Sequence, residues 1–379
     1  MNSAKQEYLV SVILPTYNSR VFIDAAIDSV LQQTERRFEL IVVDDCSTDD
    51  TANIIRRYTR RDARVRLLHM PCNGGPAAAR NAGIDAARGR WIALLDSDDV
   101  YAPQRLARLM ELAEANAADM VSDNLMMRPV GEAPYPLISP DLLPCCRHLT
   151  GAEFVLGNIG DPNNPRLSYG FMQPMIRHDF LLRHNLRHDE RNRFGEDFML
   201  YVACLHAGAR WWITPETLYH YTIRPKSLTE VQSSSDLLRI SQLEATLLSD
   251  PKVIEDPVFY DALRRHKRKI DRSYYYRAFT DSIKQKRLEE AARLLTKSRW
   301  SSYYIAQETL RQTPVILRKL VRGGYLVKKR QEAGERKPYA GAAAPKSRYV
   351  GKSSIRGPRL VSQFDTVYYS NGGKPDEPR

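Results

Sequence analysis

The first 125 residues alternate short apolar runs with segments of helical periodicity, and this alternation constrains the fold more than any other feature. A strand, a helix and a further strand at this spacing form a right-handed βαβ unit. The repeated pattern therefore predicts a parallel sheet with helices on both faces. The expected strands are 10–14, 38–43, 65–69, 91–95 and 119–122, and the expected helices are 21–33, 49–61, 76–87 and 103–116.

The rest of the chain differs in composition. Residues 129–170 are rich in Pro and Gly and predict a long loop, which is followed by a strand at 170–176, a helix at 196–207 and a strand at 210–222. Residues 233–322 have helical periodicity, and the tail is low in large aliphatic residues. We therefore expect an α/β domain over 1–230, a basic helical region over 231–330 and a disordered tail over 331–379.

Charge is distributed unevenly between these parts. Residues 251–330 hold 21 Lys and Arg against 8 Asp and Glu, whereas the first 250 residues hold 27 against 32. The basic segment could bind nucleic acid, lie on an anionic membrane surface, or form solvated helices. It contains no recognisable nucleic-acid module, so we expect no nucleic-acid partner. The stretch "RRHKRKIDRSYYYRAF" interleaves cations with Tyr and Phe, which favours the membrane surface, with solvated helices as the alternative.

Cysteine usage and hydropathy indicate a cytoplasmic protein. The five cysteines have no metal-binding spacing, and we expect all of them to be reduced. No apolar run approaches the roughly 20 residues of a membrane span. The N-terminal apolar run is short and is interrupted by Pro15, so it predicts a first strand and not a signal peptide. A peripheral position on the inner face of the plasma membrane is the second expectation for its location.

Acidic clusters follow two of the expected strands. Asp44 and Asp45 follow the second strand, and Asp96, Asp98 and Asp99 follow the fourth in "WIALLDSDD". Ligands of parallel α/β sheets bind at the carboxyl ends of the strands. Strand alternation would place Asp96 and Asp98 on one side, where paired carboxylates suit Mg²⁺ or Mn²⁺. Capping and turn formation are the alternative roles for such residues.

Phosphate groups need a different recognition element, because the sequence has no Walker loop and no GxGxxG. The stretch "NGGPAAARNAG" offers a glycine pair that allows close approach of the backbone. It also contains Arg80, whose guanidinium could serve as a cationic fork for phosphate. We therefore expect the metal and this segment together to hold a diphosphate.

An ordered set of motifs supports this expectation. "VSVILPTYN", "LQQT", "FELIVVDDCSTDDT", "NGGPAAARNAGI", "GRWIALLDSDD" and "FGEDFMLY" follow one another between residues 9 and 225. The set resembles the large family-2 group of glycosyltransferases, whose fold is the Rossmann-like GT-A fold with a mostly parallel sheet. Length and motif style resemble the bacterial exopolysaccharide chain-elongating enzymes of the succinoglycan type.

The resemblance implies roles for residues of this chain. Nucleotide-sugar binding would fall to Pro15, Thr16, Tyr17, Asn18, Asp44, Asp45, Gly75, Arg80, Asp96 and Ser97. The metal would be held first by Asp98, with Asp96, Asp99 and His220 as further candidates. Asp197 would be the general base, with Glu196 as the alternative. Arg224 and Ser227 are weaker candidates for contacts with the diphosphate.

The chemistry of sugar transfer agrees with these roles. A divalent cation stabilises the charge that develops on a departing nucleoside diphosphate, and a carboxylate base activates the incoming hydroxyl. We therefore expect a metal-dependent, inverting transferase that moves a sugar from a nucleotide-sugar, UDP-linked in the first instance. The acceptor would be a glycan or lipid-linked oligosaccharide in surface or exopolysaccharide biosynthesis. The alternatives are a nucleotidyltransferase, against which "PTYNSR" speaks, and a non-catalytic sugar- or membrane-binding relative.

Overall fold

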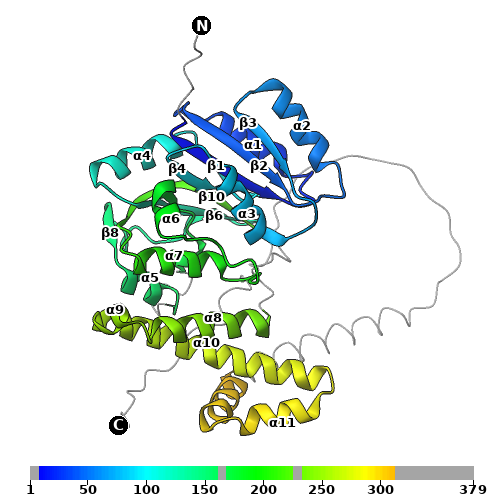
Figure 1. The fold of residues 1–379 in the computed structure, drawn as a ribbon, viewed down its shortest axis with the longest axis vertical. Coiled ribbons are helices and arrows are strands. Elements are labelled where there is room, and N and C mark those ends of the chain that lie inside the picture. The colour runs from blue at the N-terminus through cyan, green and yellow to red at the C-terminus, as the bar shows by residue number, and fades with distance from the viewer. Residues whose placement is uncertain (1–7, 161–167, 225–232, 312–379) are drawn as a thin grey trace, which may run out of the picture.

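The computed structural model describes residues 8–160, 168–224 and 233–311. Its larger part is a ten-stranded sheet covered by helices, and a group of further helices lies beneath it in Figure 1. The expected α/β class is therefore confirmed.

The sheet joins a parallel half to a mixed half. Its order is β3-β2-β1-β4-β9-β6-β10-β5, with β7 beside β6 and β8 beside β10. Neighbours are parallel from β3 to β4 and between β6 and β10, and β9 joins the halves by antiparallel pairing with β4 and β6. The strands are β1 Val10–Thr16, β2 Phe38–Asp44, β3 Val65–His69, β4 Trp91–Leu94, β5 Val100–Tyr101, β6 Met120–Pro129, β7 Tyr135–Pro136, β8 Arg147–Leu149, β9 Met175–Arg177 and β10 Trp211–Ile223.

The helices of the α/β part match the predicted positions closely. Those between the parallel strands are α1 Ile23–Leu31, α2 Thr51–Arg61, α3 Gly75–Ala86 and α4 Arg105–Ala115. Three helices follow in the second half: α5 Gly151–Gly157, α6 His178–Arg183 and α7 Glu196–His206. Pro76 stands in the first turn of α3, where its missing N–H has no intrahelical acceptor to lose.

The core lies between the parallel strands and their helices. Every residue of β1 and β2 is buried, as expected for strands covered on both faces. Helix α3 lies very close to β1, because a Cβ added at Gly83 would stand 2.4 Å from Cγ2 of Ile13. The middle of β1 and the second half of α3 are thereby held in close contact.

Two local predictions need correction. The strand expected at 170–176 is a 3₁₀ turn at Tyr169–Phe171 followed by the short β9. The strand expected at 119–122 extends over the whole of β6, and β9 separates it from β4. Local patterns did not reveal this insertion, since β9 pairs with strands about 85 and 55 residues earlier.

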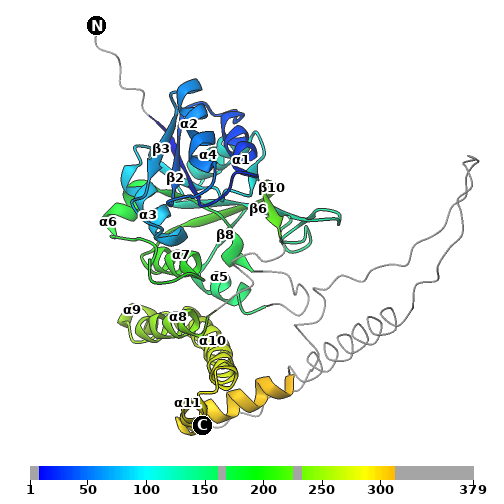
Figure 2. The ribbon, with the colours of Figure 1, turned by 90° about the vertical axis from the view of Figure 1, so that its right-hand side faces the viewer.

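The basic helical region packs under α5 and α7 (Figure 2). Its elements are α8 Ser234–Leu247, α9 Pro251–Ile254, α10 Pro257–Lys284 and α11 Leu288–Thr296, and residues 299–311 are also helical. Helix α10 contacts α5, α8 and α11, and its buried residues include Phe259, Leu263 and Ile270. Residues 312–330 and the tail 331–379 lie outside the described residues.

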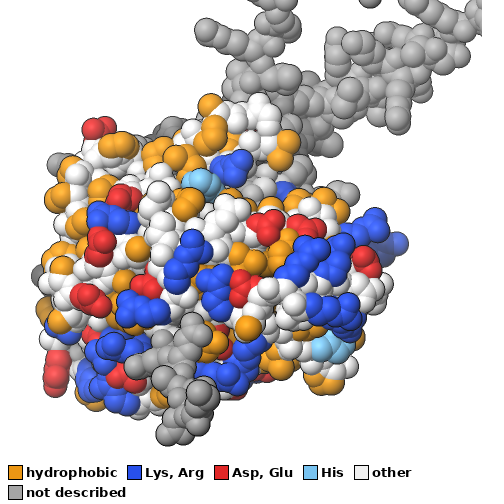
Figure 3. Space-filling model, turned by 90° about the horizontal axis from the view of Figure 1, so that it is seen from above, with side chains coloured by type: hydrophobic (Ala, Val, Ile, Leu, Met, Phe, Trp, Pro, Cys, Tyr) orange, Lys and Arg blue, Asp and Glu red, His pale blue; other side chains and the backbone are white. Residues whose placement is uncertain are grey.

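The remaining sequence-wide expectations concern charge, cysteines and membrane spans. The face seen from above in Figure 3 mixes Lys and Arg with Asp and Glu. All five cysteines are free, as expected. Within the described ranges, every helix is too short or too polar to cross a bilayer.

Candidate active site

A cleft of about 800 Å³ lies at the carboxyl ends of β1 and β4. One side is formed by the loops that follow these strands and by the start of α3. The other side is formed by the start of α7 and by residues of α8 and α10, including Leu237, Ile240 and Ile270. The helical region therefore contributes directly to the wall of the cleft, which its sequence did not indicate.

The loop after β1 forms one rim of the cleft. Pro15, Thr16, Tyr17 and Asn18 all line it, as the resemblance implied. Asn18 has φ 51°, a left-handed conformation that Asn tolerates better than most residues. Its side-chain oxygen accepts a hydrogen bond of 2.8 Å from the N–H of Thr48, so the loops after β1 and β2 are joined.

The two carboxylates after β2 have different positions. Asp45 lines the cleft and accepts hydrogen bonds of 2.8 Å from the N–H groups of both Gly74 and Gly75. Asp44 is fully buried and is not among the residues that line the cleft. Its carboxylate contacts Nδ1 of His69 at 2.8 Å, and the structure therefore gives it a role in joining β2 to β3.

The "DSDD" stretch is a turn. Strand β4 ends at Leu94, and the N–H of Asp99 donates to the carbonyl of Asp96 at 3.1 Å. The expectation that strand alternation orients Asp96 and Asp98 therefore does not apply, although both line the cleft. The turn, and not strand alternation, places both carboxylates in the cleft.

Asp99 is held inside the protein. Its carboxylate accepts hydrogen bonds from the hydroxyl of Tyr219 at 2.8 Å and from the N–H of Thr222 at 2.7 Å. Burial and the neighbouring carboxylates raise its pKa well above the ordinary value. Asp99 also lines the cleft, and with both oxygens engaged it fixes the turn to β10.

Asp98 faces the cleft and forms an ion pair with Arg224. Burial and the charge of Asp96 raise the pKa of Asp98, whereas Arg224 lowers it. Ser97 stands between Asp96 and Asp98 in the sequence, and its hydroxyl contacts the hydroxyl of Ser19 at 2.8 Å. Ser227, the other weak candidate from the sequence, lies outside the described residues.

Arg80 differs from its expected role as a phosphate fork. Its guanidinium is buried and lies 2.9 Å from Oδ1 of Asp96, 2.7 Å from Oε1 of Glu196 and 3.2 Å from Oδ1 of Asp197. Burial lowers the pKa of Arg80, but the charges of these three carboxylates outweigh that effect and raise it above the ordinary value. Arg80 thus joins the turn after β4 to the start of α7, because a buried cation is stable only where anions surround it.

Asp197 stands in the first turn of α7, where the helix dipole favours a carboxylate. Gly195 precedes it with φ 74°, which lets the chain enter the helix from the cleft side. Burial raises the pKa of Asp197 to about 8, against the opposing effect of Arg80. A carboxylate with this property suits proton abstraction.

Sequence reasoning missed two groups beside this carboxylate. Nδ1 of the buried His188 lies 3.5 Å from Oδ1 of Asp197, and burial lowers the pKa of His188 so that it is neutral. The hydroxyl of Tyr201 is buried one helical turn after Asp197 and has no hydrogen-bond partner among the described residues. Tyr201 ends the motif "FGEDFMLY", but the resemblance implied no role for it, and His188 lies outside every quoted motif.

The residues present fit a divalent cation of the magnesium type. Burial and the charge of Asp96 raise the pKa of Asp98, and a bound cation would relieve this destabilisation of the Asp98 carboxylate. Within the described ranges, no group of three His, Cys, Asp or Glu side chains could enclose a metal. Mg²⁺ and Mn²⁺ need few protein ligands when phosphate oxygens and water complete the shell. His220 is half-buried and does not line the cleft, so the structure does not bring it to these carboxylates.

Comparisons with known proteins give one consistent result. Residues 11–181 match the family described as glycosyl transferase family 2. The succinoglycan biosynthesis proteins ExoO and ExoU of Rhizobium meliloti (strain 1021) are 38% and 33% identical to this chain. The ExoO alignment covers 64% of this chain and 66% of ExoO, and the ExoU alignment covers 72% and 78%. This chain thus spans about two thirds of ExoO and more than three quarters of ExoU.

Solved structures are similar in fold. S. aureus TarS 1–349 in complex with UDP-GlcNAc has a TM-score of 0.56 and 18% identity, over 75% of this chain and 89% of that one. The mannosyltransferase PcManGT from Pyrobaculum calidifontis, in complex with GDP-Man and Mn²⁺, has a TM-score of 0.50 and 17% identity, over 81% and 88%. At these identities the likeness shows a GT-A fold and nothing finer.

Proposed function

The chain belongs to glycosyl transferase family 2, and on this premise we propose that it transfers a sugar from a nucleotide-sugar to a hydroxyl group of a glycan. We propose further that the reaction inverts the anomeric configuration and uses Mn²⁺ or Mg²⁺. One observation carries the proposal: the carboxylates of Asp96, Asp98 and Asp197 meet in a single cleft although they are about a hundred residues apart.

Each wall of the cleft would bind one of the two substrates. The nucleotide would occupy the sheet side, against the loop after β1 and beside Asp45. Asp96 and Asp98 would hold the divalent cation, which when bound stabilises negative charge on the leaving diphosphate. Arg224 lines the cleft beside Asp98, and its guanidinium would be within reach of a donor phosphate placed there.

Asp197 would remove the proton from the attacking hydroxyl. It lies across Arg80 from Asp96, so the base and the donor carboxylates are fixed relative to each other. A single in-line attack from the base side would displace the diphosphate and invert the anomeric carbon. Glu196 is the weaker candidate, because its Oε1 is bound to Arg80 at 2.7 Å.

The biological setting follows from the relatives. ExoO and ExoU are both named for succinoglycan biosynthesis, and we propose a role for this chain in the assembly of an exopolysaccharide. The complex of TarS with UDP-GlcNAc supports testing UDP-sugars first as donors. A glycan or lipid-linked oligosaccharide would be the acceptor.

A donor panel tests the proposal. The full-length protein should release UDP from at least one UDP-sugar with Mn²⁺, and chelation should abolish the release. Asp197→Asn should stop transfer while UDP still binds, with Asp85→Asn on the exposed face of α3 as a control that retains activity. Activity that survives chelation would refute the metal dependence, and an active Asp197→Asn variant would refute the assignment of the base.

We also propose that the basic helical region contacts an anionic membrane surface. Its described part exposes large apolar side chains beside its cations: Leu288 at 66%, Trp300 at 51% and Leu310 at 75%. Amphipathic helices of this composition bind at lipid interfaces. Flotation with phosphatidylglycerol vesicles should fall in a Leu288→Ser/Leu310→Ser variant and not in Val130→Ser, which is as exposed on the α/β part. Equal flotation of all three proteins would refute this surface.

A further inference from the structure

The cations that line the cleft differ in what their charged groups contact. Arg80 is surrounded by three carboxylates, and Arg224 is paired with Asp98. Lys269 of α10 donates to the carbonyl of Asn158 at 2.7 Å. Arg193 lines the same cleft, and among the described residues its guanidinium has no hydrogen-bond or ion-pair partner. An exposed guanidinium in a cleft of this kind is available to an anionic ligand.

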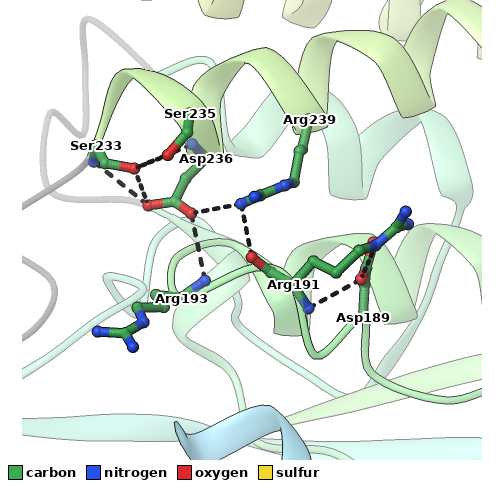
Figure 4. Close-up of polar contacts among 7 residues, drawn as sticks. All are labelled: Asp189, Arg191, Arg193, Ser233, Ser235, Asp236 and Arg239. Carbon is green, nitrogen blue, oxygen red and sulfur yellow. Dashed lines mark hydrogen bonds and ion pairs between the residues drawn. The ribbon is translucent and has the colours of Figure 1, made fainter.

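The backbone that carries Arg193 is held firmly from α8. The N–H of Arg193 donates to Oδ1 of Asp236 at 3.3 Å, and Nη1 of Arg239 donates to the carbonyl of Arg191 at 2.6 Å. Asp236 itself is fixed by a capping box with Ser233 at the start of α8. Figure 4 shows these contacts, with the guanidinium of Arg193 pointing away from them.

This segment belongs to the same wall as α10. A Cβ added at Gly195 would stand 2.8 Å from Cδ1 of Ile240 on α8, and α8 packs along α10. Ile240 and Ile270 both line the cleft from this side, as do Arg193 and Lys269. Two basic residues therefore line the cleft on the side away from the strand ends that carry Asp96 and Asp98.

The position of the two cations relative to the base indicates which substrate they face. Arg193 precedes Asp197 by four residues, and the base must lie beside the accepting hydroxyl. The donor, by contrast, would be held by Asp96 and Asp98 on the other wall. A ligand group bound by Arg193 is thus a group of the acceptor.

We propose that Arg193, with Lys269, forms an anion subsite that selects acceptors bearing a carboxylate or a phosphate near the accepting hydroxyl. The inference rests on the proposed function, because it assigns the acceptor half of that reaction. Both anions suit the bidentate geometry of a guanidinium, and they differ in source: an acidic sugar or a phosphorylated one.

Binding measurements test the subsite without turnover. Calorimetric titration of the full-length protein, saturated with UDP and Mg²⁺, would use three probes. These are a β-linked glucose disaccharide, its terminal 6-carboxylate and its terminal 6-phosphate. We expect one charged probe to bind at least about tenfold more tightly than the neutral one, which corresponds to about 1.4 kcal/mol. The tighter charged probe identifies the source of the anion.

Variants assign the effect to the residue. Arg193→Gln should remove the preference for the charged probe and leave UDP affinity unchanged. Lys269→Met should reduce the preference, provided that its circular dichroism matches the parent protein. Arg191→Gln is the matched control, because this neighbouring arginine is paired with Asp189 at 2.7 Å and lies outside the cleft lining.

Two results would overturn the subsite. One is equal binding of the three probes to the parent protein, including no measurable binding of any of them. The other is an Arg193→Gln variant that retains the preference for the charged probe, whether or not its UDP affinity changes. A failed donor panel alongside a preserved charge preference would instead count against the proposed reaction, so the two failures can be told apart.

Discussion

Replacing Asp197 by Asn should make the protein more stable while it removes transfer. Burial raises the pKa of Asp197 from 3.8 to about 8, so the folded chain resists the ionisation that the unfolded chain undergoes readily at neutral pH. Between pH 4 and pH 8, each pH unit therefore costs the folded state about 1.4 kcal/mol relative to an uncharged side chain. At pH 7 the accumulated cost is roughly 4 kcal/mol.

The sign of this effect makes the prediction specific. A carboxyl group with a raised pKa contributes its full stability below pH 4, and that contribution is lost as the pH rises toward 8. Asn carries no such cost, so the two proteins should have similar free energies of unfolding at pH 4.5. The difference between them should grow as the pH rises. Urea unfolding at pH 4.5, 6 and 8, with chelator present, measures the difference at each pH.

A matched control separates this effect from general changes in charge. Asp85→Asn removes an exposed carboxylate of α3 and should change the free energy of unfolding by less than about 0.5 kcal/mol at every pH. If Asp197→Asn is no more stable than the parent at pH 8, or if the difference does not grow with pH, the reasoning about burial is wrong. The predicted gain would appear in thermal unfolding as a rise of roughly 10 °C at neutral pH.

Three further predictions concern the same site. Asp98→Asn should lower metal-dependent transfer by about a hundredfold or more and abolish the increase in UDP affinity on adding Mn²⁺, as measured by calorimetry. Arg80→Met should destabilise the fold by about 3–5 kcal/mol in urea at pH 8, because it leaves buried carboxylates without a cation; Arg108→Met at the surface should cost less than about 1 kcal/mol. Gly195→Ala should lose about 1–2 kcal/mol and reduce transfer with UDP affinity retained, since φ is 74° and the added Cβ would meet Ile240 at 2.8 Å.

Local sequence predicted the parallel half of the sheet well. Its first two strands are continuous, fully buried runs, so the sequence pattern and tertiary burial point to the same structure. The mixed half was predicted less well. Strand β9 has three residues, and only its pairing with β4 and β6 makes it a strand.

The candidate site shows the same division between local and long-range information. The resemblance named the cleft-lining carboxylates Asp96, Asp98 and Asp197, and their roles stay predictions. It could not place Arg80 between them, because that contact joins residues more than a hundred positions apart. The resemblance also could not show that the carboxylate of Asp99 accepts a hydrogen bond from the hydroxyl of Tyr219. That contact forms only once β10 is folded beside the turn.

The walls of the cleft come from two stretches of chain that do not interleave. Every residue of the first stretch lies before position 100, and every residue of the second lies after position 157. A single recombination event between these positions could therefore join the first stretch of one gene to the second stretch of another. Such an exchange would keep each stretch intact, provided that the cation corresponding to Arg80 still contacts its carboxylates across the junction and the cation corresponding to Arg224 still pairs with Asp98.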